Sequence, residues 1–335
     1  MLRSAIAYAS AAITCVVPVA ALSQEAAERP GGVWSGLIEN DWFASTDQNY
    51  TNGARLARFA EADPGGTHYD FAGGILRARP ERDEVIYGFA LGQNLYTPED
   101  TDTALPLPGQ RPYAAWLYGE YSLIRIGEER VDQLTFQLGT VGPNALGEEV
   151  QNGFHDLIGG EDAEGWDNQI GNEVGFVLSL DRKLKSRYLV REIRGLDIDF
   201  TPNAGIAFGN IRTDAKLGAT LRIGTGLSDD FGPPRIRPAS AGVGYFSPDE
   251  PNGFYAFFGA QGRAVAHDIT LEGSLFDDDD GITVEPETFV GETQAGFVWR
   301  LNGWQLGYTH VWRGEEYEGQ TDGQRFGALS VAVRF

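Results

Sequence analysis

Residues 131–140 read VDQLTFQLGT, and from Gln133 to Leu138 polar and apolar side chains alternate. Successive side chains of an extended strand point to opposite faces, so Leu134, Phe136 and Leu138 share one face. The threonine and the glutamines between them share the other face. This period of two residues predicts a β-strand whose two faces meet different environments.

The same alternation recurs along the chain, with aromatic residues near the strand ends. Residues 292–301 place Phe297 and Trp299 opposite Gln294 and Arg300, and residues 304–313 repeat the pattern. We predict twelve strands in all. They are 32–42, 50–60, 84–96, 113–126, 131–141, 170–182, 194–210, 214–225, 253–266, 285–300, 303–313 and 323–335.

These strands predict an all-β protein, a twelve-stranded antiparallel transmembrane β-barrel of the bacterial outer membrane. Each stretch has about the 9–11 residues that a tilted membrane strand needs, or more. The number is even, and the last strand ends the chain on the aromatic Phe335. The alternative is a soluble β-sandwich or a lipocalin-like barrel, which carries the same alternation.

The first 23 residues have the composition of a secretory signal peptide. Arg3 supplies a positive start, residues 5–21 are apolar, and Ala21-Leu22-Ser23 gives a small-x-small cleavage site. We therefore expect residues 1–23 to be removed and residues 24–335 to form the barrel domain. A single transmembrane anchor is the alternative, and Pro18 argues against it. The only cysteine, Cys15, lies in this segment, so the mature chain has no disulfide to stabilise it.

The chain carries a formal net charge of −22 at pH 7. This charge and the lack of a basic cluster exclude nucleic acid as a partner. An acidic exported protein suits metal cations, or a surface on which divalent cations bridge anionic lipids, although acidic charge also simply keeps proteins soluble. We expect a monomer.

In a barrel with an even number of strands, both termini lie on the periplasmic side, so the loops after odd strands face outward. Polar stretches studded with aromatic residues fall in these loops, at 39–53, 96–113 and 142–169. They should meet at the outer end of the barrel. The connections at 61–83 and 226–252 should lie on the periplasmic side, where turns are usually short.

Residues 145–158 predict a short amphipathic helix in the third of these outward loops. Its apolar face carries Leu146, Val150, Phe154, Leu157 and Ile158. Gln151 and His155 lie four residues apart at the edge of that face. A histidine can take a proton from water near neutral pH, but a surface histidine without a catalytic role is the commoner case.

The residues around His155 favour metal-assisted hydrolysis over a serine mechanism. Five acidic residues surround it, which are the hard oxygen ligands that calcium prefers: Glu148, Glu149, Asp156, Glu161 and Asp162. No serine occurs between residues 123 and 178. A remote serine, Ser35 or Ser45, could still approach in space. The local chemistry favours a histidine-activated water with a metal-stabilised oxyanion.

Five motifs that run in order from residue 39 to residue 173 resemble those of the LpxR family of outer-membrane lipid A 3-O-deacylases. They are ENDWF followed by TD and YTNG (39–53), GQNLYTP (92–98), QRPYAAWLY (110–118), VGPNALGEEVQNGFHDLIG (141–159) and GWDNQIGNE (165–173). The resemblance implies a twelve-stranded barrel that, with Ca²⁺, hydrolyses the ester of the 3′-acyloxyacyl group of lipid A. Lipid A, or lipopolysaccharide, would be the substrate.

The resemblance also implies the site residues. The catalytic positions of the family fall on Asn40, Asp41, Thr51, Gln151 and His155. His155 would deprotonate the attacking water, while Asn40, Thr51 and Gln151 would orient groups by hydrogen bonds. Calcium would be held by carboxylate and carbonyl oxygens, with Glu161 and Asp41 as candidates.

The chain departs from the family pattern in the loop after YTP. Some relatives carry a basic pair there that could hold a lipid A phosphate, whereas residues 97–110 contain no Lys or Arg and Arg111 is the first cation. Ala115 stands where glycine is usual. Two other classes of function therefore stay open, an outer-membrane phospholipase that uses a serine and a barrel without catalytic activity.

Strand geometry limits where the site can lie. If the first strand stays regular, Asn40 and Asp41 point to opposite faces, with Asn40 on the face of Trp34 and Ile38. Either the strand has ended or bulged at this point, or the site lies on the lipid-facing side of the barrel wall. In the second case the helix at 145–158 would cover the wall.

Overall fold

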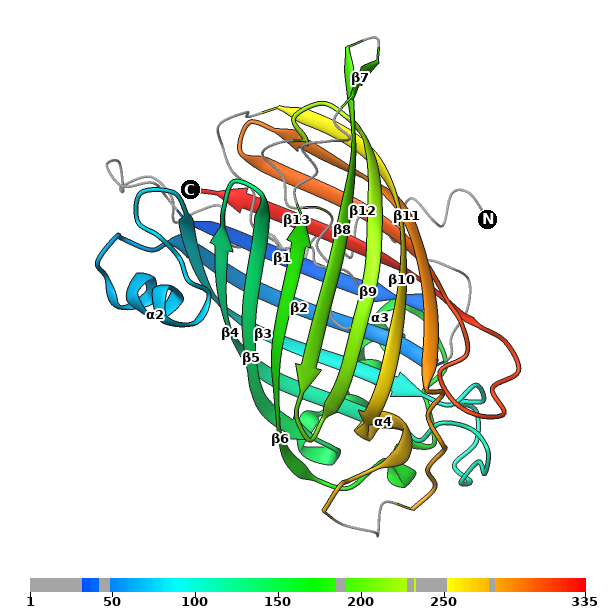
Figure 1. The fold of residues 1–335 in the computed structure, drawn as a ribbon. Coiled ribbons are helices and arrows are strands. Elements are labelled where there is room, and N and C mark those ends of the chain that lie inside the picture. Colours follow the sequence, from blue (N-terminus) through cyan, green and yellow to red (C-terminus); the bar gives the residue numbers. More distant parts are fainter. Residues whose placement is uncertain are drawn as a thin grey trace.

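The computed structural model describes residues 32–41, 49–184, 191–193, 195–227, 232, 252–276 and 281–335 (Figure 1). The expected signal peptide, residues 1–23, lies outside the described residues. The strands are β1 Val33–Asn40, β2 Asn49–Glu61, β3 Glu84–Thr97, β4 Ala114–Ile126, β5 Arg130–Val141, β6 Glu173–Leu184, β7 Arg191–Ile193, β8 Leu196–Phe208, β9 Arg212–Gly224, β10 Gly253–Asp268, β11 Phe289–Leu301, β12 Trp304–Arg313 and β13 Gln324–Arg334. The α-helices are α2 Thr67–Ile75, α3 Gly147–Ile158 and α4 Ile269–Glu272.

The strands form one closed antiparallel barrel. Each pairs with its neighbour in the sequence, β1 pairs with β13, and β6 pairs with β8. The three-residue β7 pairs with β8 alone among the described strands and projects beyond the barrel (Figure 1). Twelve strands therefore close the wall, which confirms the predicted fold class. We call the end where β1 begins and β13 ends the inner end, and the opposite end the outer end.

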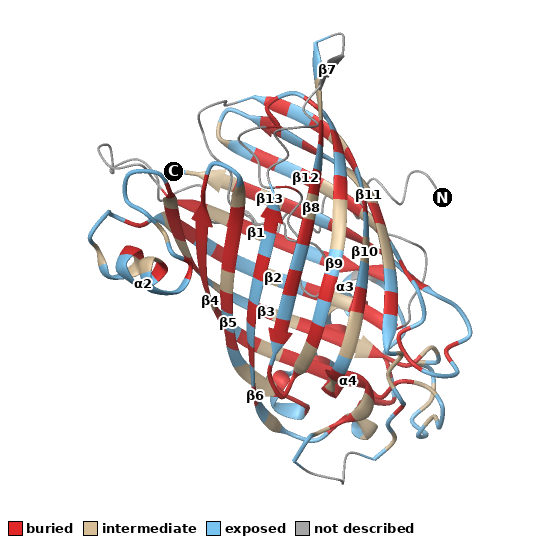
Figure 2. Ribbon diagram, viewed as in Figure 1, coloured by how far each residue is buried: buried red, intermediate tan, exposed pale blue. Residues whose placement is uncertain are grey.

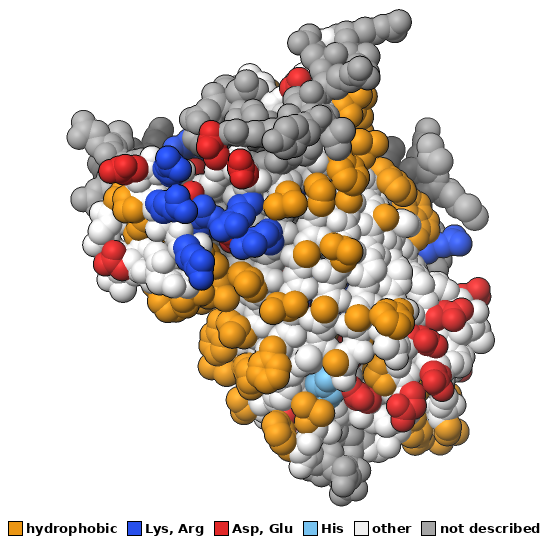
Figure 3. Space-filling model, viewed as in Figure 1, with side chains coloured by type: hydrophobic (Ala, Val, Ile, Leu, Met, Phe, Trp, Pro, Cys, Tyr) orange, Lys and Arg blue, Asp and Glu red, His pale blue; other side chains and the backbone are white. Residues whose placement is uncertain are grey.

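The alternation in the sequence separates the lumen from the outer wall. On β5, Gln133, Thr135 and Gln137 are buried in the lumen, while Phe136 and Leu138 are exposed on the outer wall. Buried and exposed residues alternate along most strands in this way (Figure 2). Exposed apolar side chains form a band over the outer wall, as expected where lipid meets a membrane barrel (Figure 3).

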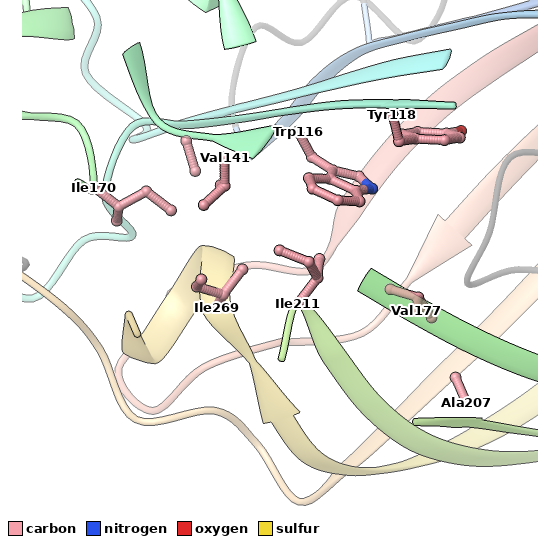
Figure 4. Packing of buried hydrophobic residues seen from close by; sticks show 9 residues of the cluster. Trp116, Tyr118, Val141, Ile170, Val177, Ala207, Ile211 and Ile269 are labelled. Atoms are coloured by element: carbon pink, nitrogen blue, oxygen red, sulfur yellow. The ribbon is translucent and has the colours of Figure 1, made fainter. Parts of the chain in front are cut away.

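Side chains fill the lumen near its outer end. On one side lies an apolar cluster (Figure 4), whose members include Trp116, Tyr118, Val141, Ile170, Val177, Ala207, Ile211 and Ile269. On the other side, the buried Glu316 pairs with Arg263 at 3.0 Å and with Arg313 at 3.2 Å. Burial disfavours a charged carboxylate, but these guanidinium groups hold the pKa of Glu316 below its usual value. The space left between the two sides is a cavity of about 30 Å³.

A helix that the sequence analysis did not predict, α2, lies in the connection 61–83. Tyr69, Ala72 and Leu76 pack on Val85 and Leu123, side chains of β3 and β4 that face away from the lumen. The helix therefore lies against the outer wall at the inner end (Figure 1). The other long connection, 226–252, lies largely outside the described residues. No described helix is long and apolar enough to cross a membrane.

Candidate active site

The Asn-Asp pair lies where the first strand ends. Asn40 is the last residue of β1 and is paired with Asn52 of β2, and Asp41 follows in a turn of 3₁₀ helix. By alternation Asn40 shares the outward face with Ile38. Ile38 is exposed, but Asn40 and Asp41 are both buried, so the wall is covered at this point. The strand therefore ends after Asn40, and Asn40 lies on the lipid-facing side of the wall.

A β-bulge positions Thr51. The register of β2 against β3 shifts between Tyr50 and Asn52, which leaves Thr51 as the extra residue. Tyr50 enters the lumen and its hydroxyl donates to Glu39. Thr51 instead makes a hydrogen bond of 2.7 Å with Thr97, whose strand position faces outward. The sequence analysis did not single out Thr97, because one hydroxyl at a strand end has no distinctive pattern.

Asn49 is a second residue that the sequence analysis did not single out. It begins β2 in a left-handed conformation, with φ of 70°, and is paired with Thr97. Its side chain is fully buried, and neither its amide nitrogen nor its oxygen has a hydrogen-bond partner. Buried polar atoms are rarely left in this state. Asn49 therefore leaves an oxygen and an N–H group available beside Thr51.

The loop 142–170 packs onto the outer wall beside these residues. The Gln93 amide on β3 donates to the carbonyl of Ala145 at 2.6 Å. Ala145, Ala163 and Trp166 form a buried cluster with outward side chains of β3 and β4, among them Leu95 and Ala115. Helix α3, which the sequence predicted within two residues at its start, is held against the outside of the barrel by these contacts.

Helix α3 buries Gln151 and His155 and leaves Val150 and Leu157 exposed. Its exposed surface also carries Glu148, Glu149 and Asp156, and Phe154 is half-buried. Gln151 is 3% exposed and His155 is 8% exposed. Leu146, Val150 and Leu157 are instead 49%, 40% and 58% exposed. A helix on the surface of a soluble protein is arranged the other way round. The arrangement fits a helix whose outer surface contacts lipid and whose inner surface encloses a polar site.

Trp166 fixes the orientation of Gln151. The Trp166 indole, which can only donate, gives its N–H to Gln151 Oε1 at 2.8 Å. The Gln151 nitrogen therefore points away from Trp166, and this buried atom has no hydrogen-bond partner. Among the described residues it is thus a buried donor without an acceptor, a state that is rare in folded proteins.

The backbone fixes the ring of His155. His155 Nδ1 lies 2.5 Å from the carbonyl oxygen of Glu161, which can only accept a hydrogen bond. A proton on Nδ1 leaves Nε2 of the neutral ring as the basic atom. The side chain of Glu161 is exposed, so the contact that links it to His155 is made by its backbone. The sequence could not predict this contact.

The oxygen atoms at this end of the wall suit a hard cation such as calcium. Among the described residues, no three His, Cys, Asp or Glu side chains are close enough to hold a metal ion together. The carboxylate of Asp41 is buried, and the unbonded Asn49 oxygen is of the type that calcium accepts. These donors are of the chemical type that calcium accepts, and Asp41 stays the charged candidate that the family resemblance implies.

Two other residues named from the sequence lie away from this site. Arg111 is buried on the lumen side, over the ring of Tyr96 and hydrogen-bonded to Thr270, so it is not placed to meet a phosphate at the surface. Ser35 is buried on the opposite face of β1 from Asn40, near the inner end, so it does not approach His155. Ser45 lies outside the described residues.

Comparisons with known proteins match the whole barrel. The family model described as "LpxR: Outer membrane protein LpxR" matches residues 7–335. No curated protein sequence matches the chain. Among solved structures, the chain is similar to LpxR from Salmonella typhimurium, with 20% identity and a TM-score of 0.71, over 90% of this chain and 100% of that chain.

Two autotransporter barrels are less similar. The beta domain of the Bordetella autotransporter Brka has 12% identity and a TM-score of 0.46, over 92% of this chain and 100% of that chain. The translocator domain of NalP from Neisseria meningitidis has 10% identity and a TM-score of 0.38, over 99% and 98% of the two chains.

Proposed function

The chain belongs to the LpxR family of outer-membrane proteins, and on that premise we propose that it is a calcium-dependent hydrolase of lipid A. Membership of the family implies a lipid A deacylase role and a location in the outer membrane. We propose further that the bond cleaved is the ester of the 3′-acyloxyacyl group in the outer leaflet. The products are then the free acyloxyacyl acid and a lipid A with a free 3′-hydroxyl.

The inverted burial of α3 is the observation that carries this proposal. The buried side chains of Gln151 and His155 lie on the outside of the barrel, and the apolar side chains of the same helix face outward. A substrate that reaches this site from the membrane can keep its acyl chains against the exposed apolar face. Its ester can then meet the polar side chains beneath the helix.

His155 supplies the acid–base chemistry. With Nδ1 held by the Glu161 carbonyl, Nε2 takes a proton from water as the water oxygen bonds to the ester carbonyl carbon. The carbonyl π electrons move to its oxygen and form a tetrahedral oxyanion. When the intermediate collapses, the bond from the acyl carbon to the 3′ oxygen breaks, and the imidazolium returns its proton to the leaving 3′ oxygen.

Amide and hydroxyl groups orient the ester. The Gln151 nitrogen, which has no hydrogen-bond partner among the described residues, donates a hydrogen bond to the carbonyl oxygen as charge develops on it. Asn40 and the Thr51–Thr97 pair lie at the same outer end of the wall and position the substrate by hydrogen bonds. Trp166 acts through Gln151 and is therefore a positioning residue.

Calcium, when bound, would stabilise the negative charge that forms on the carbonyl oxygen. We assign the Asp41 carboxylate to hold it, together with oxygens from the loop around Glu161. Chelation should abolish deacylation by the purified barrel, and added calcium should restore it. Full activity in a strong chelator would remove the metal from the mechanism.

The decisive experiment for the function is mass spectrometry of lipid A from cells that express the protein. Wild-type protein should lower the lipid A mass by that of the acyloxyacyl group, and folded His155→Ala should leave the mass unchanged. Release of a glycerophospholipid acyl chain with labelling by a serine-directed reagent would favour the phospholipase alternative. No change in any lipid would favour the barrel without catalytic activity.

A further inference from the structure

A cluster of arginines lies on the outer wall at the inner end of the barrel, opposite the candidate active site. Three of them surround the buried carboxylate of Asp132, a residue on the outward face of β5. Arg125 and Arg130 each lie 3.0 Å from it, and Arg182 lies 2.6 Å away. In Figure 3, Lys and Arg side chains gather near one end of this face, next to the band of hydrophobic side chains.

Hydrogen bonds connect this cluster to helix α2. Arg125 reaches from Asp132 to Asp83, to which it donates two hydrogen bonds of 3.0 and 2.8 Å. The carbonyl of Asp83 accepts from the Tyr69 hydroxyl of α2 at 2.7 Å. The positions of Asp132, Arg125 and α2 are therefore linked. Tethered side chains lose less conformational freedom when they bind a ligand than free surface arginines do.

The charges in this cluster do not balance. Three guanidinium groups meet two carboxylates, those of Asp83 and Asp132. Arg130 and Arg182 each contact the Asp132 carboxylate through Nε, and their side chains are 36% and 48% exposed. The Nη groups of the two arginines, which carry eight N–H bonds between them, are available to an anion. A phosphate is an anion that guanidinium forks match in shape and charge.

The surroundings of the cluster suit a lipid. Along β5 and β6, outward apolar side chains begin two residues from Asp132 and Arg182, with Leu134 and Leu180, and continue toward the outer end. Next to the cluster, α2 leaves Phe71 and Ile75 exposed at 47% and 49%. A ligand with a phosphate and acyl chains can therefore bind both parts of this surface at once.

We propose that Arg130 and Arg182, with α2 beside them, form a binding site for an anionic phospholipid of the inner leaflet. The phosphate meets the two guanidinium groups, and the acyl chains lie along the apolar faces of β5 and β6. The site lies at the end of the barrel opposite to α3, so it is independent of the proposed hydrolysis.

The test is native mass spectrometry of the folded barrel in detergent with added phosphatidylglycerol. Wild-type protein should retain this lipid and should not retain phosphatidylcholine to the same degree. The double variant Arg130→Gln/Arg182→Gln should bind it on the order of tenfold more weakly, since each basic group near an anionic lipid makes a similar contribution. Arg125 stays unchanged because it anchors α2.

The matched control is Arg58→Gln/Arg325→Gln, which changes the net charge equally at two exposed arginines of other strands. It should retain phosphatidylglycerol like the wild type. Glycerol phosphate, which has the head-group phosphate but no acyl chains, should not displace the lipid at equal concentration. Equal retention by both double variants, or displacement by glycerol phosphate, would overturn the proposal. Heat-modifiable mobility shows that each variant is folded, and deacylation should be unchanged in Arg130→Gln/Arg182→Gln.

Discussion

Helices α2 and α3 both pack on the outside of the barrel, at opposite ends of the wall formed by β3 and β4, and they bury opposite kinds of side chain. Helix α2 buries Tyr69, Ala72 and Leu76. Helix α3 buries Gln151 and His155 and leaves Leu157 exposed. The first arrangement is that of a helix that stabilises a wall by apolar contact, and the second is that of a helix that covers a polar site.

The difference shows that the kind of side chain buried beneath a helix distinguishes a helix that stabilises the barrel from one that covers a candidate active site. Burying apolar side chains is favourable by itself, so α2 needs no further explanation. Burying an amide and an imidazole while apolar residues stay exposed is unfavourable in water. This cost is smaller where the exposed apolar face contacts lipid, and it is offset where the buried polar groups bind a substrate. The predictions below test this contrast, from the largest expected effect to the smallest.

The largest effect is expected from His155→Ala. Loss of a general base typically costs 10²-fold or more in turnover, so deacylation of purified lipid A in detergent micelles should fall by about that factor. His68→Ala, at a half-buried histidine on α2 at the opposite end of the wall, is the control and should keep its activity. Near-full turnover by folded His155→Ala would show that His155 has no catalytic role.

Trp166→Phe should have a smaller effect on the same reaction. Phenylalanine retains most of the ring packing against Ala145 and Ala163 but cannot donate to Gln151. With its orientation no longer fixed, Gln151 should stabilise the oxyanion less well, and kcat should fall on the order of tenfold with little change in KM. Steady-state kinetics on micellar lipid A distinguish this from a packing defect, which would also lower heat-modifiability.

The exposed apolar face of α3 gives a third test. Val150→Asn/Leu157→Asn should raise the apparent KM for lipid A in vesicles several-fold, because the acyl chains lose apolar contact, and should leave the chemical step unchanged. Phe71→Asn/Ile75→Asn makes the same change on the exposed face of α2, at the other end of the wall. Equal losses in the two double variants would contradict a specific role for α3.

The smallest effect is expected at α2, where Asp83 links the helix to the wall. Burial disfavours its charged form, but hydrogen bonds from Arg125 and from the Arg79 amide hold its pKa below the usual 3.8. The folded-state pKa is thus lowered, so its stabilising contribution is present above about pH 4 and is lost as the pH falls through the folded value. Asp83→Asn should remove this dependence, with deacylation unchanged. Hydrogen exchange of residues 67–75 at pH 6 and at pH 3 measures it.

The sequence predicted the barrel well because its two environments impose a strict alternation. The stretch around Phe136 and the one around Trp299 differ in sequence, yet both lie on strands that face lipid and lumen as predicted. Helix α2 was missed because THYDFAGGI is short and contains two consecutive glycines, which disfavour a helix. Only contact with the wall stabilises it.

The site was predicted less completely, for physical reasons. Periodicity shows that Gln151 and His155 share an edge of α3, but not which face of the helix meets the wall. The bulge at Thr51 depends on pairing with β3, and the contact to His155 is made by the backbone of Glu161. Local sequence does not encode such contacts. The family resemblance supplied Asn40 and Asp41, and the barrel places them at the end of β1.

The most direct test of the central claim is a double-mutant cycle between α3 and the wall. The rates of acyloxyacyl release are measured for wild type, His155→Ala, Asn40→Ala and the double variant, each purified as a folded, heat-modifiable barrel. If the helix and the wall form one catalytic unit, each single change costs on the order of 10²-fold, and the double variant is little slower than either. If the two losses multiply, or if His155→Ala keeps near-full turnover, α3 and the end of β1 do not form one active site.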